Sequence, residues 1–379
     1  MKARKLITIL LVLSLVLTLP NIAYAMPTSR HDAAKNYVLD MYDKDDGIFY
    51  LDPDTKTTNI EVVYSSVLVL YLFDTLEDIN TTKVALWINS TLNLEDINDT
   101  NNYGGFASSP GGTPDIYSTY YAIQTLFYLD ELDMVKNTTL IAEWINRTKN
   151  ADGGYGYYPG KPSTLISTYY AIECLILLNE LSYINYTELK NLVLDLQVSD
   201  KSSIDYGAFK GSFNESAASI ESTYAAVNIL YLLNAVDELN YTLINNWVMQ
   251  KWANGGFRPS KAHYPDIFST YWCISTLNIT TNASISSILD IENVTRWVLS
   301  LQKEDGGFSV YSIDETSSPI ATALAIETLY LLGSMGELDN QVPWEKGGLT
   351  YLYLFLILIF GSIAVVTLAM YVKSKIKRY

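Results

Sequence analysis

The sequence predicts an all-α protein, an α/α toroid (α6-α6 barrel) in which six helix-pair repeats close into a ring. Three observations predict it. A glycine-rich turn ending in an aromatic residue recurs at intervals of 48–57 residues between positions 49 and 308, and a period of about 50 residues is typical of stacked supersecondary units. Long apolar helical segments alternate with shorter polar ones over the same stretch. Neither end of the array has the polar capping unit that an open solenoid needs, so we expect a closed ring.

Residues 1–25 are expected to be a secretory signal peptide. Lys2, Arg4 and Lys5 precede an apolar run over residues 6–19, and Ala23-Tyr24-Ala25 is a small-x-small cleavage site. This order is typical of signal peptides. The alternative is an uncleaved N-terminal anchor, which the short apolar run disfavours because a membrane-spanning helix needs about 20 apolar residues.

Residues 26–340 hold the repeat, and its first mark is the glycine-rich turn. Glycine suits a turn between antiparallel helices because it accepts positive φ and close backbone approach. We expect the aromatic side chain to fill the space between neighbouring helices. Four copies are complete and two are degenerate: Gly104-Gly105-Phe106, Gly153-Gly154-Tyr155, Gly255-Gly256-Phe257, Gly306-Gly307-Phe308, Asp46-Gly47-Ile48-Phe49 and Tyr206-Gly207-Ala208-Phe209.

The other two marks predict the two helices of each unit. About ten to fifteen residues after each turn, a Ser-Thr-aromatic segment opens an apolar helix; it begins at Ser118, Ser167, Ser222 and Ser269, with weaker copies at 64–66 and 321–323. A polar helix carrying Trp87, Trp144, Trp247 or Trp297 precedes the next turn, and Leu192-Val193 takes this place once. Because two-layer packing buries the more apolar set, we expect the apolar helices inside and the polar helices outside.

The C-terminal end predicts a membrane anchor. After a linker over residues 341–348, residues 349–372 form an uncharged run of 24 residues, and the tail 373–379 carries Lys373, Lys375, Lys377 and Arg378. Such a run is long enough to cross a bilayer as a helix, and basic residues stay on the cytoplasmic side. The expected location is the cell membrane, single-pass, with the body extracytoplasmic; a buried core helix is the alternative.

Charge and sequons agree with an exported body. All 41 acidic residues and only 18 of the 25 basic residues lie between the two terminal segments, so the body carries a formal charge of about −23. Nucleic acid is excluded as a partner because phosphate binding needs a basic surface. Two cysteines, Cys174 and Cys273, are too few for a disulfide framework. N-glycosylation acceptors occur at Asn80, Asn89, Asn98, Asn137, Asn146, Asn185, Asn214, Asn240, Asn278, Asn282 and Asn293.

Over roughly residues 30–335 this pattern resembles the prenyltransferase and squalene-cyclase α/α-toroid superfamily. It is nearest to the β subunits of protein geranylgeranyl- and farnesyltransferases. Two stretches carry the resemblance, one from Gly207 to Ala226 and one from Gly255 through Asp266-Ile267-Phe268-Ser269-Thr270-Tyr271-Trp272. The resemblance implies the fold; it does not by itself imply the activity.

The chemistry that the resemblance implies is incomplete here. The zinc-ligand aspartate of those transferases matches Asp266, but Phe268 stands at the cysteine position and Ala321 near the histidine position, and a catalytic zinc needs three protein ligands. An improvised site of Asp266 with Cys273 and His263 is the remaining way to bind zinc. Arg258 and Lys261 resemble the lipid-diphosphate pair, offset by two residues, while Glu221 stands where a third basic residue is expected.

Two further motifs of the superfamily are a cyclase acid and a thioester run. Asp43-Lys44-Asp45-Asp46 matches the Asp-x-Asp-Asp acid of the cyclases, but it runs straight into Gly47 and so predicts a solvated turn rather than a catalytic acid. The Cys-Gly-Glu-Gln run of the thioester proteins with the same fold does not occur.

The starts of the inner helices are the candidate ligand site. They carry Tyr120, Tyr121, Tyr169, Tyr170, Tyr224, Tyr271 and Trp272, and aromatic side chains of this kind suit lipid or sugar ligands. The alternative is that many of these rings pack against the outer helices. Asp115 and Asp266 occupy equivalent positions before an inner helix, where they are either helix N-caps or the two carboxylates of a hydrolase.

The sequence therefore predicts a membrane-anchored binding or scaffold module without catalysis and without a resident cofactor. The expected partners are the membrane, through the C-terminal helix, and a hydrophobic, isoprenoid, peptide or glycan ligand. The candidate ligand-binding residues are Arg258, Lys261, Asp266, Tyr120, Tyr169, Tyr224, Tyr271, Trp272 and Asp115. Three alternatives stay open: a zinc-dependent prenyltransferase or cyclase, a carboxylate-based hydrolase, and a purely structural surface component.

Overall fold

The computed structural model describes residues 28–51, 55–135, 137–259, 262–281 and 284–343. The predicted signal peptide, membrane helix and basic tail lie outside these residues, as do Lys261 and Asn282. Within the described part of the chain, no helix is long and apolar enough to span a membrane. The chain divides into two compact units, residues 34–336 and a unit formed by the two ends.

The terminal unit joins the two ends of the chain by backbone pairing. Ser29 and Gln341 form an antiparallel bridge. The Arg30 N–H donates to the Asn340 carbonyl at 2.9 Å, and the Val342 N–H donates to the Thr28 carbonyl at 3.1 Å. The predicted linker over residues 341–348 therefore begins with residues that pair with the N-terminal segment.

Twelve α-helices occur in the described residues, in two alternating sets. The polar set is α2 (Arg30–Asp40), α4 (Thr81–Ser90), α6 (Thr138–Arg147), α8 (Tyr186–Asp195), α10 (Tyr241–Met249) and α12 (Ile291–Ser300). The apolar set is α3 (Ile60–Leu72), α5 (Ile116–Tyr128), α7 (Leu165–Leu177), α9 (Ile220–Leu232), α11 (Ile267–Thr280) and α13 (Pro319–Leu331). Two short hairpins complete the list: β1 (Tyr42–Asp43) with β2 (Ile48–Phe49), and β3 (Trp252–Ala253) with β4 (Gly256–Phe257).

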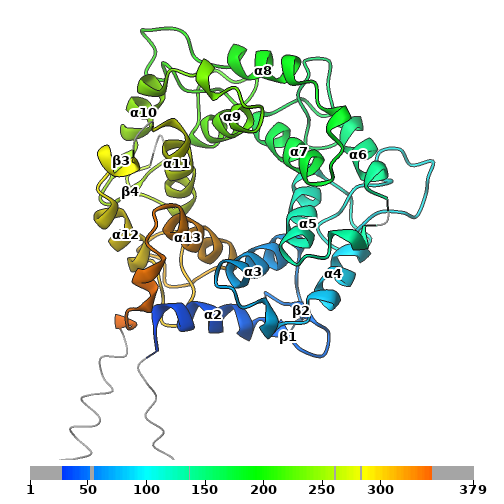
Figure 1. The fold of residues 1–379 in the computed structure, drawn as a ribbon, viewed down its shortest axis with the longest axis vertical. Coiled ribbons are helices and arrows are strands. Elements are labelled where there is room, and N and C mark those ends of the chain that lie inside the picture. The colour runs from blue at the N-terminus through cyan, green and yellow to red at the C-terminus, as the bar shows by residue number, and fades with distance from the viewer. Residues whose placement is uncertain (1–27, 52–54, 136, 260–261, 282–283, 344–379) are drawn as a thin grey trace, which may run out of the picture. The chain divides into compact units, whose positions relative to one another are not determined.

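The apolar helices of residues 34–336 form a closed inner ring. Each packs against the next, in the order α3, α5, α7, α9, α11 and α13, and α13 packs back onto α3 (Figure 1). Helices α4, α6, α8, α10 and α12 each pack on the inner helix that follows them. The predicted α/α toroid is confirmed, and closure removes the exposed apolar faces that an open array would leave at its two ends.

Each glycine-rich turn is fixed by the helix layers around it. All six turn aromatics are fully buried, as predicted: Phe49, Phe106, Tyr155, Phe209, Phe257 and Phe308. Gly104 has φ +99°, and a Cβ at Gly105 would lie 2.4 Å from the Trp144 ring on α6. The first glycine therefore supplies the turn, and the second makes room for the tryptophan that forms the third mark of the repeat.

The Ser-Thr-aromatic segment ties each inner helix to its turn. The Phe106 N–H donates to Thr119 Oγ1 at 3.1 Å, and the Phe257 N–H donates to Thr270 Oγ1 at 2.9 Å. The same bond joins Tyr155 to Thr168, Phe209 to Thr223 and Phe308 to Thr322. Because a buried N–H without a partner is costly, the threonine fixes the turn to its helix in five of the six units.

Asparagine sequons begin four of the outer helices. Asn80, Asn137, Asn185 and Asn240 are the N-caps of α4, α6, α8 and α10, and each side chain accepts from the backbone N–H three residues later. All four are exposed. They satisfy one free N–H of their helix, and as glycan acceptors they stay predictions.

Candidate functional site

One tyrosine position is repeated around the inner ring. Five residues after the N-cap of each inner helix stand Tyr64, Tyr120, Tyr169, Tyr224, Tyr271 and, on α13, Ala323. We call the five tyrosines the tyrosine girdle. Their rings form a continuous chain from α3 to α11, with successive centroids 6.1, 6.5, 5.5 and 5.9 Å apart.

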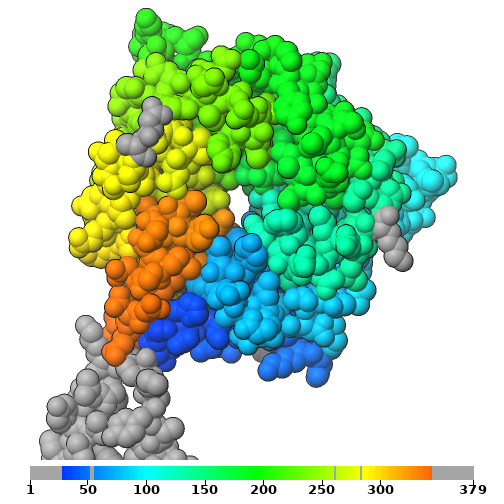
Figure 2. Space-filling model, viewed as in Figure 1, coloured from blue at the N-terminus to red at the C-terminus, as the bar shows by residue number. Residues whose placement is uncertain are grey.

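The girdle lies around the central space of the ring, which we call the lumen. Figure 2 shows residues 34–336 hollowed at this centre. The Tyr271 hydroxyl on α11 lies 3.5 Å from Glu327 on α13, and the charge of Glu327 also raises the pKa of tyrosines on α3, α5 and α9. A charge that acts on helices from all round the ring indicates a side chain directed toward its centre. Tyr120, Tyr169, Tyr224 and Tyr271 therefore face the lumen and not the outer helices.

A second aromatic layer adjoins the girdle. Tyr170 stacks on Tyr120 with centroids 4.1 Å apart, and Tyr121 lies 4.8 Å from Tyr64. Trp272 contacts Tyr224 at 6.5 Å. These rings give the lumen an aromatic wall, and aromatic side chains suit apolar ligands.

Carboxylates form the polar part of the lumen wall. Nine residues after the N-cap stand Glu173 on α7 and Glu327 on α13, and two residues after it stand Glu61 on α3 and Glu221 on α9. Gln124 Nε2 donates to Glu173 at 2.8 Å. The hydroxyls of Tyr271 and Tyr121 lie 3.5 and 3.4 Å from Glu327 and Glu61.

These carboxyl groups have raised pKa values. Burial raises the pKa of Glu327 to about 8, against the opposing hydrogen bond from Tyr271 and with help from the charge of Glu173. Burial also raises the pKa of Glu61, Glu173 and Glu221. Among the described residues, no lysine, arginine or histidine forms an ion pair with any of the four. In the part of the chain that the structure describes, these four carboxyl groups therefore have no cationic partner.

The two aspartates predicted as a cap or a carboxylate pair are caps. Asp115 and Asp266 accept hydrogen bonds from both the N–H and the hydroxyl of the serine three residues later, each at 2.8 Å. Both are buried. Burial raises the pKa of Asp266, and its bonds from Ser269 oppose this. They begin α5 and α11, which are not neighbours in the ring.

The residues that resemble a transferase site do not assemble one. Arg258 Nη1 donates to the Ala262 carbonyl at 2.8 Å and so closes its own loop, while Lys261 lies outside the described residues. Ala321 is fully buried, and Cys273 is buried without a disulfide partner. In the described part of the chain, no three His, Cys, Asp or Glu side chains are placed to hold a metal. The improvised zinc set of Asp266, Cys273 and His263 is thus not formed.

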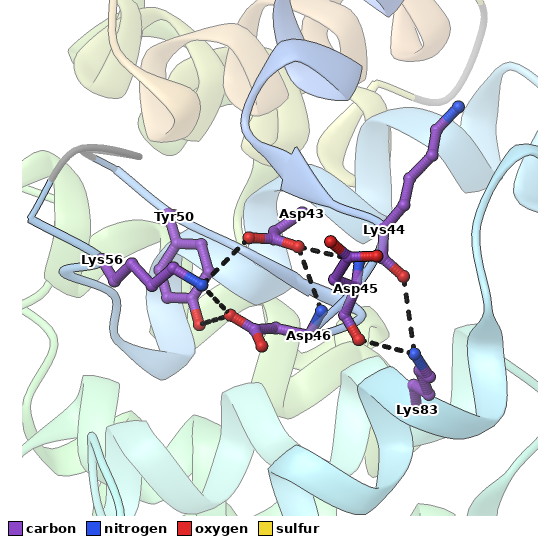
Figure 3. A network of polar contacts seen from close by, with 7 residues as sticks. All are labelled: Asp43, Lys44, Asp45, Asp46, Tyr50, Lys56 and Lys83. Carbon is purple, nitrogen blue, oxygen red and sulfur yellow. Dashed lines mark hydrogen bonds and ion pairs between the residues drawn. The ribbon is translucent and has the colours of Figure 1, made fainter.

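The cyclase-like acidic string is a surface turn, as predicted. Asp43 accepts from the N–H groups of Asp45 and Asp46 at 2.8 and 3.0 Å, and the Lys56 ammonium pairs with Asp43 at 3.2 Å and with Asp46 (Figure 3). The Lys83 ammonium donates to the Asp45 carbonyl at 2.7 Å. The backbone donors and Lys56 lower the pKa of Asp43, which keeps it ionised and unsuited to be a general acid.

Comparison with known proteins defines the class. The model of the prenyltransferase alpha-alpha toroid domain matches residues 3–97, 97–139, 120–253 and 242–346. The chain belongs to this family. Comparison with curated proteins finds no match.

Solved structures share the fold at low identity. Protein geranylgeranyltransferase-I of Candida albicans, complexed with GGPP, has a TM-score of 0.66 and 17% identity, covering 83% of this chain and 93% of that chain. The type II terpene cyclase MstE from Scytonema has a TM-score of 0.55 and 14% identity, covering 81% and 97%. A variant of that cyclase with its substrate geranylgeranyl dihydroxybenzoate has a TM-score of 0.56 and 13% identity, covering 81% and 97%.

Three of the four lumen carboxylates, Glu61, Glu173 and Glu327, are the residues that sequence reasoning missed. Glu173 and Glu327 stand nine residues after their N-caps, where α5, α9 and α11 carry Gln124, Asn228 and Ser275 and α3 carries Leu68. One polar residue at the same point of five inner helices was the available signal. The marks of the repeat drew attention only to the first two turns of these helices.

Proposed function

We propose that this chain is a non-catalytic binding module that holds an apolar, isoprenoid-like ligand in its lumen. The single observation that carries the proposal is the tyrosine girdle, five rings in mutual contact around the centre of a closed ring. A core built only for packing would fill these positions with aliphatic side chains, which have no polar group to satisfy. Tyrosine instead combines an apolar face with a hydroxyl tip, as in ligand sites.

The comparisons support the ligand class. Two proteins that share the fold carry geranylgeranyl groups in their complexes, as GGPP in one and geranylgeranyl dihydroxybenzoate in the other. Their identities of 17% and 13% relate the folds and leave the ligand of this chain to experiment.

The absence of a reacting centre favours binding over catalysis. Phe268 and Ala321 occupy two of the three zinc-ligand positions implied by the resemblance, and Asp266 is engaged as a helix cap. Glu327, with a pKa of about 8, is too weak an acid to protonate an alkene efficiently, because proton transfer follows acid strength. Among the described residues, prenyl transfer therefore lacks two of its three zinc-ligand side chains, and the two aspartates weighed for hydrolysis, Asp115 and Asp266, are both engaged as helix caps.

The location that we propose is the outer face of a cell membrane. It rests on the signal-peptide pattern of residues 1–25, the uncharged run 349–372 and the basic tail after it. A glycosylated body outside the cytoplasm is separated from cytosolic prenyl donors, which also favours binding over prenyl transfer.

Titration of the purified full-length chain with geranylgeraniol tests the proposal. Saturation at about 100 times the dissociation constant should stabilise the chain by about 2.7 kcal/mol, measured as a rise in the melting temperature. Tyr169→Ala should weaken binding about tenfold or more, since it removes one ring of the girdle. Tyr186→Ala, on the exposed face of α8, is the matched control and should bind normally.

Three results would contradict the proposal. An unchanged melting temperature in the presence of geranylgeraniol would show that the chain does not bind this ligand. Equal affinities of the Tyr169→Ala and Tyr186→Ala variants for geranylgeraniol would show that the ligand binds outside the lumen. Stoichiometric zinc in the purified chain would restore the prenyl-transfer alternative, because a tightly bound zinc ion stays with the protein during purification.

A further inference from the structure

We propose that the ligand of the lumen carries an ammonium group, so that the site takes an apolar amine and rejects an isoprenoid diphosphate. This inference rests on the proposed function and adds the charge of the ligand. It is argued from the aromatic cavity and from the sign of the groups that line it.

The girdle gathers aromatic rings around the centre of the ring. Five tyrosines line the lumen, and Tyr121, Tyr170 and Trp272 extend the wall. Aromatic faces attract a cation within about 6 Å of the ring centre, and several rings together form the cage that binds quaternary ammonium groups. An anion against the same faces is repelled.

The carboxylates of the lumen add to this preference. Glu173 and Glu327 act electrostatically on each other across the ring, and their hydrogen-bond partners among the described residues are tyrosines and Gln124. Glu61 and Glu221 lie three residues before the girdle position on α3 and α9. None of the four has a basic partner in the described residues. A cationic ligand supplies the charge that these groups lack.

Two other occupants are disfavoured by the same geometry. A diphosphate would face carboxylates and tyrosine faces, while Arg258, the described half of the diphosphate-like pair, is bonded to the carbonyl of its own loop. A metal ion would need three ligands within one site, and the described residues offer no such group. An ammonium group needs only aromatic faces and one carboxylate.

The test compares three ligands that share one apolar tail and differ in the head group. Geranylamine, geraniol and geranyl diphosphate are titrated into the full-length chain by calorimetry at pH 8.5, where Glu327, with a pKa of about 8, is mostly ionised. We expect the amine to bind at least tenfold more tightly than the alcohol, and the diphosphate not to bind. Glu327→Gln should weaken binding of the amine about tenfold and leave the affinity for the alcohol unchanged. Glu143→Gln, on the exposed face of α6, should change neither.

The other outcomes refute either the ammonium inference alone or the proposed function as well. Binding of the alcohol without preference for the amine, or equal binding of the diphosphate, would refute the ammonium inference and keep the proposed function. An amine affinity that is the same in Glu327→Gln and in the unaltered chain would refute it too. Failure of all three probes, together with geranylgeraniol, would refute the proposed function and with it this inference.

Discussion

Replacing Glu327 by glutamine should make the stability of the ring less dependent on pH. Burial raises the pKa of Glu327 from 4.5 to about 8, so the folded chain holds this proton more tightly than the unfolded chain. For an acid with a raised pKa, stability is complete below about pH 4.5 and falls as the pH rises toward 8. Glutamine has the shape of the neutral acid and no proton to lose.

The size of the effect follows from the pKa. Each unit between the two states is worth about 1.4 kcal/mol, so the rise from 4.5 to about 8 corresponds to about 5 kcal/mol at alkaline pH. The Glu327 side chain is partly exposed to the lumen, and solvent there screens its charge. We therefore expect the variant to gain about 2–3 kcal/mol over the unaltered chain between pH 5 and pH 9.

Melting temperatures at pH 5, 7 and 9 measure this difference. For about 300 ordered residues, 2–3 kcal/mol corresponds to about 3–5 °C. The neighbours that titrate or carry charge on the packed helices are Glu173, Tyr64, Tyr128, Tyr224 and Tyr271; they remain in both proteins. Glu143→Gln on the outer surface should show no pH-dependent gain. A Glu327→Gln difference that stays constant from pH 5 to pH 9 would refute the placement of this carboxyl in the lumen.

Two further predictions concern the frame of the ring. Gly105→Ala would place a Cβ 2.4 Å from the Trp144 ring and should destabilise the chain by about 1–3 kcal/mol through overpacking. In the control Gly336→Ala the new Cβ meets nothing within 4 Å, so the free energy of unfolding should change by no more than about 0.5 kcal/mol. Equal melting temperatures of the two variants would contradict the contact between the turn and the tryptophan. Asn185→Ala should lower stability by about 1 kcal/mol because it removes the cap of α8, while Thr187→Ala removes the same sequon and keeps the cap. If only loss of the sequon matters, the two variants will melt at the same temperature. A mass shift at this site in the unaltered chain will show whether the sequon is glycosylated.

The repeat and the ring could be predicted because they depend on short sequence motifs. The Gly-Gly-aromatic turn, the Ser-Thr start and the outer tryptophan are each local, and they contact one another directly: Phe106 bonds to Thr119, and Trp144 lies against Gly105. The surface turn at Asp43 was predictable for the same reason, since the following Gly47 already indicates a turn. Contacts within one repeat unit are encoded within about 50 residues, so a single chain reveals them.

The orientation of the inner helices could not be predicted in the same way. Helices such as α11 and α13 are apolar on nearly every side, so periodicity does not separate a face toward the lumen from a face toward the outer helices. Tyr169 was therefore open to both interpretations until the neighbouring helices were placed. Glu173 and Glu327 come from helices more than 100 residues apart, and their proximity follows from closure of the ring and from nothing in either segment.

The caps of the inner helices show why a match to one family ligand is weak evidence for metal chemistry. The six caps are Asn59, Asp115, Thr164, Ser219, Asp266 and Ser318, and every side chain accepts from the backbone N–H three residues later. Asp266 thus performs a task that asparagine, threonine or serine performs elsewhere in the same ring, and that task alone accounts for an aspartate at this position. A carboxylate already holding two hydrogen bonds in a helix cap, with phenylalanine and alanine at the partner positions, stabilises a fold; the chemistry of this chain is to be sought in the lumen instead.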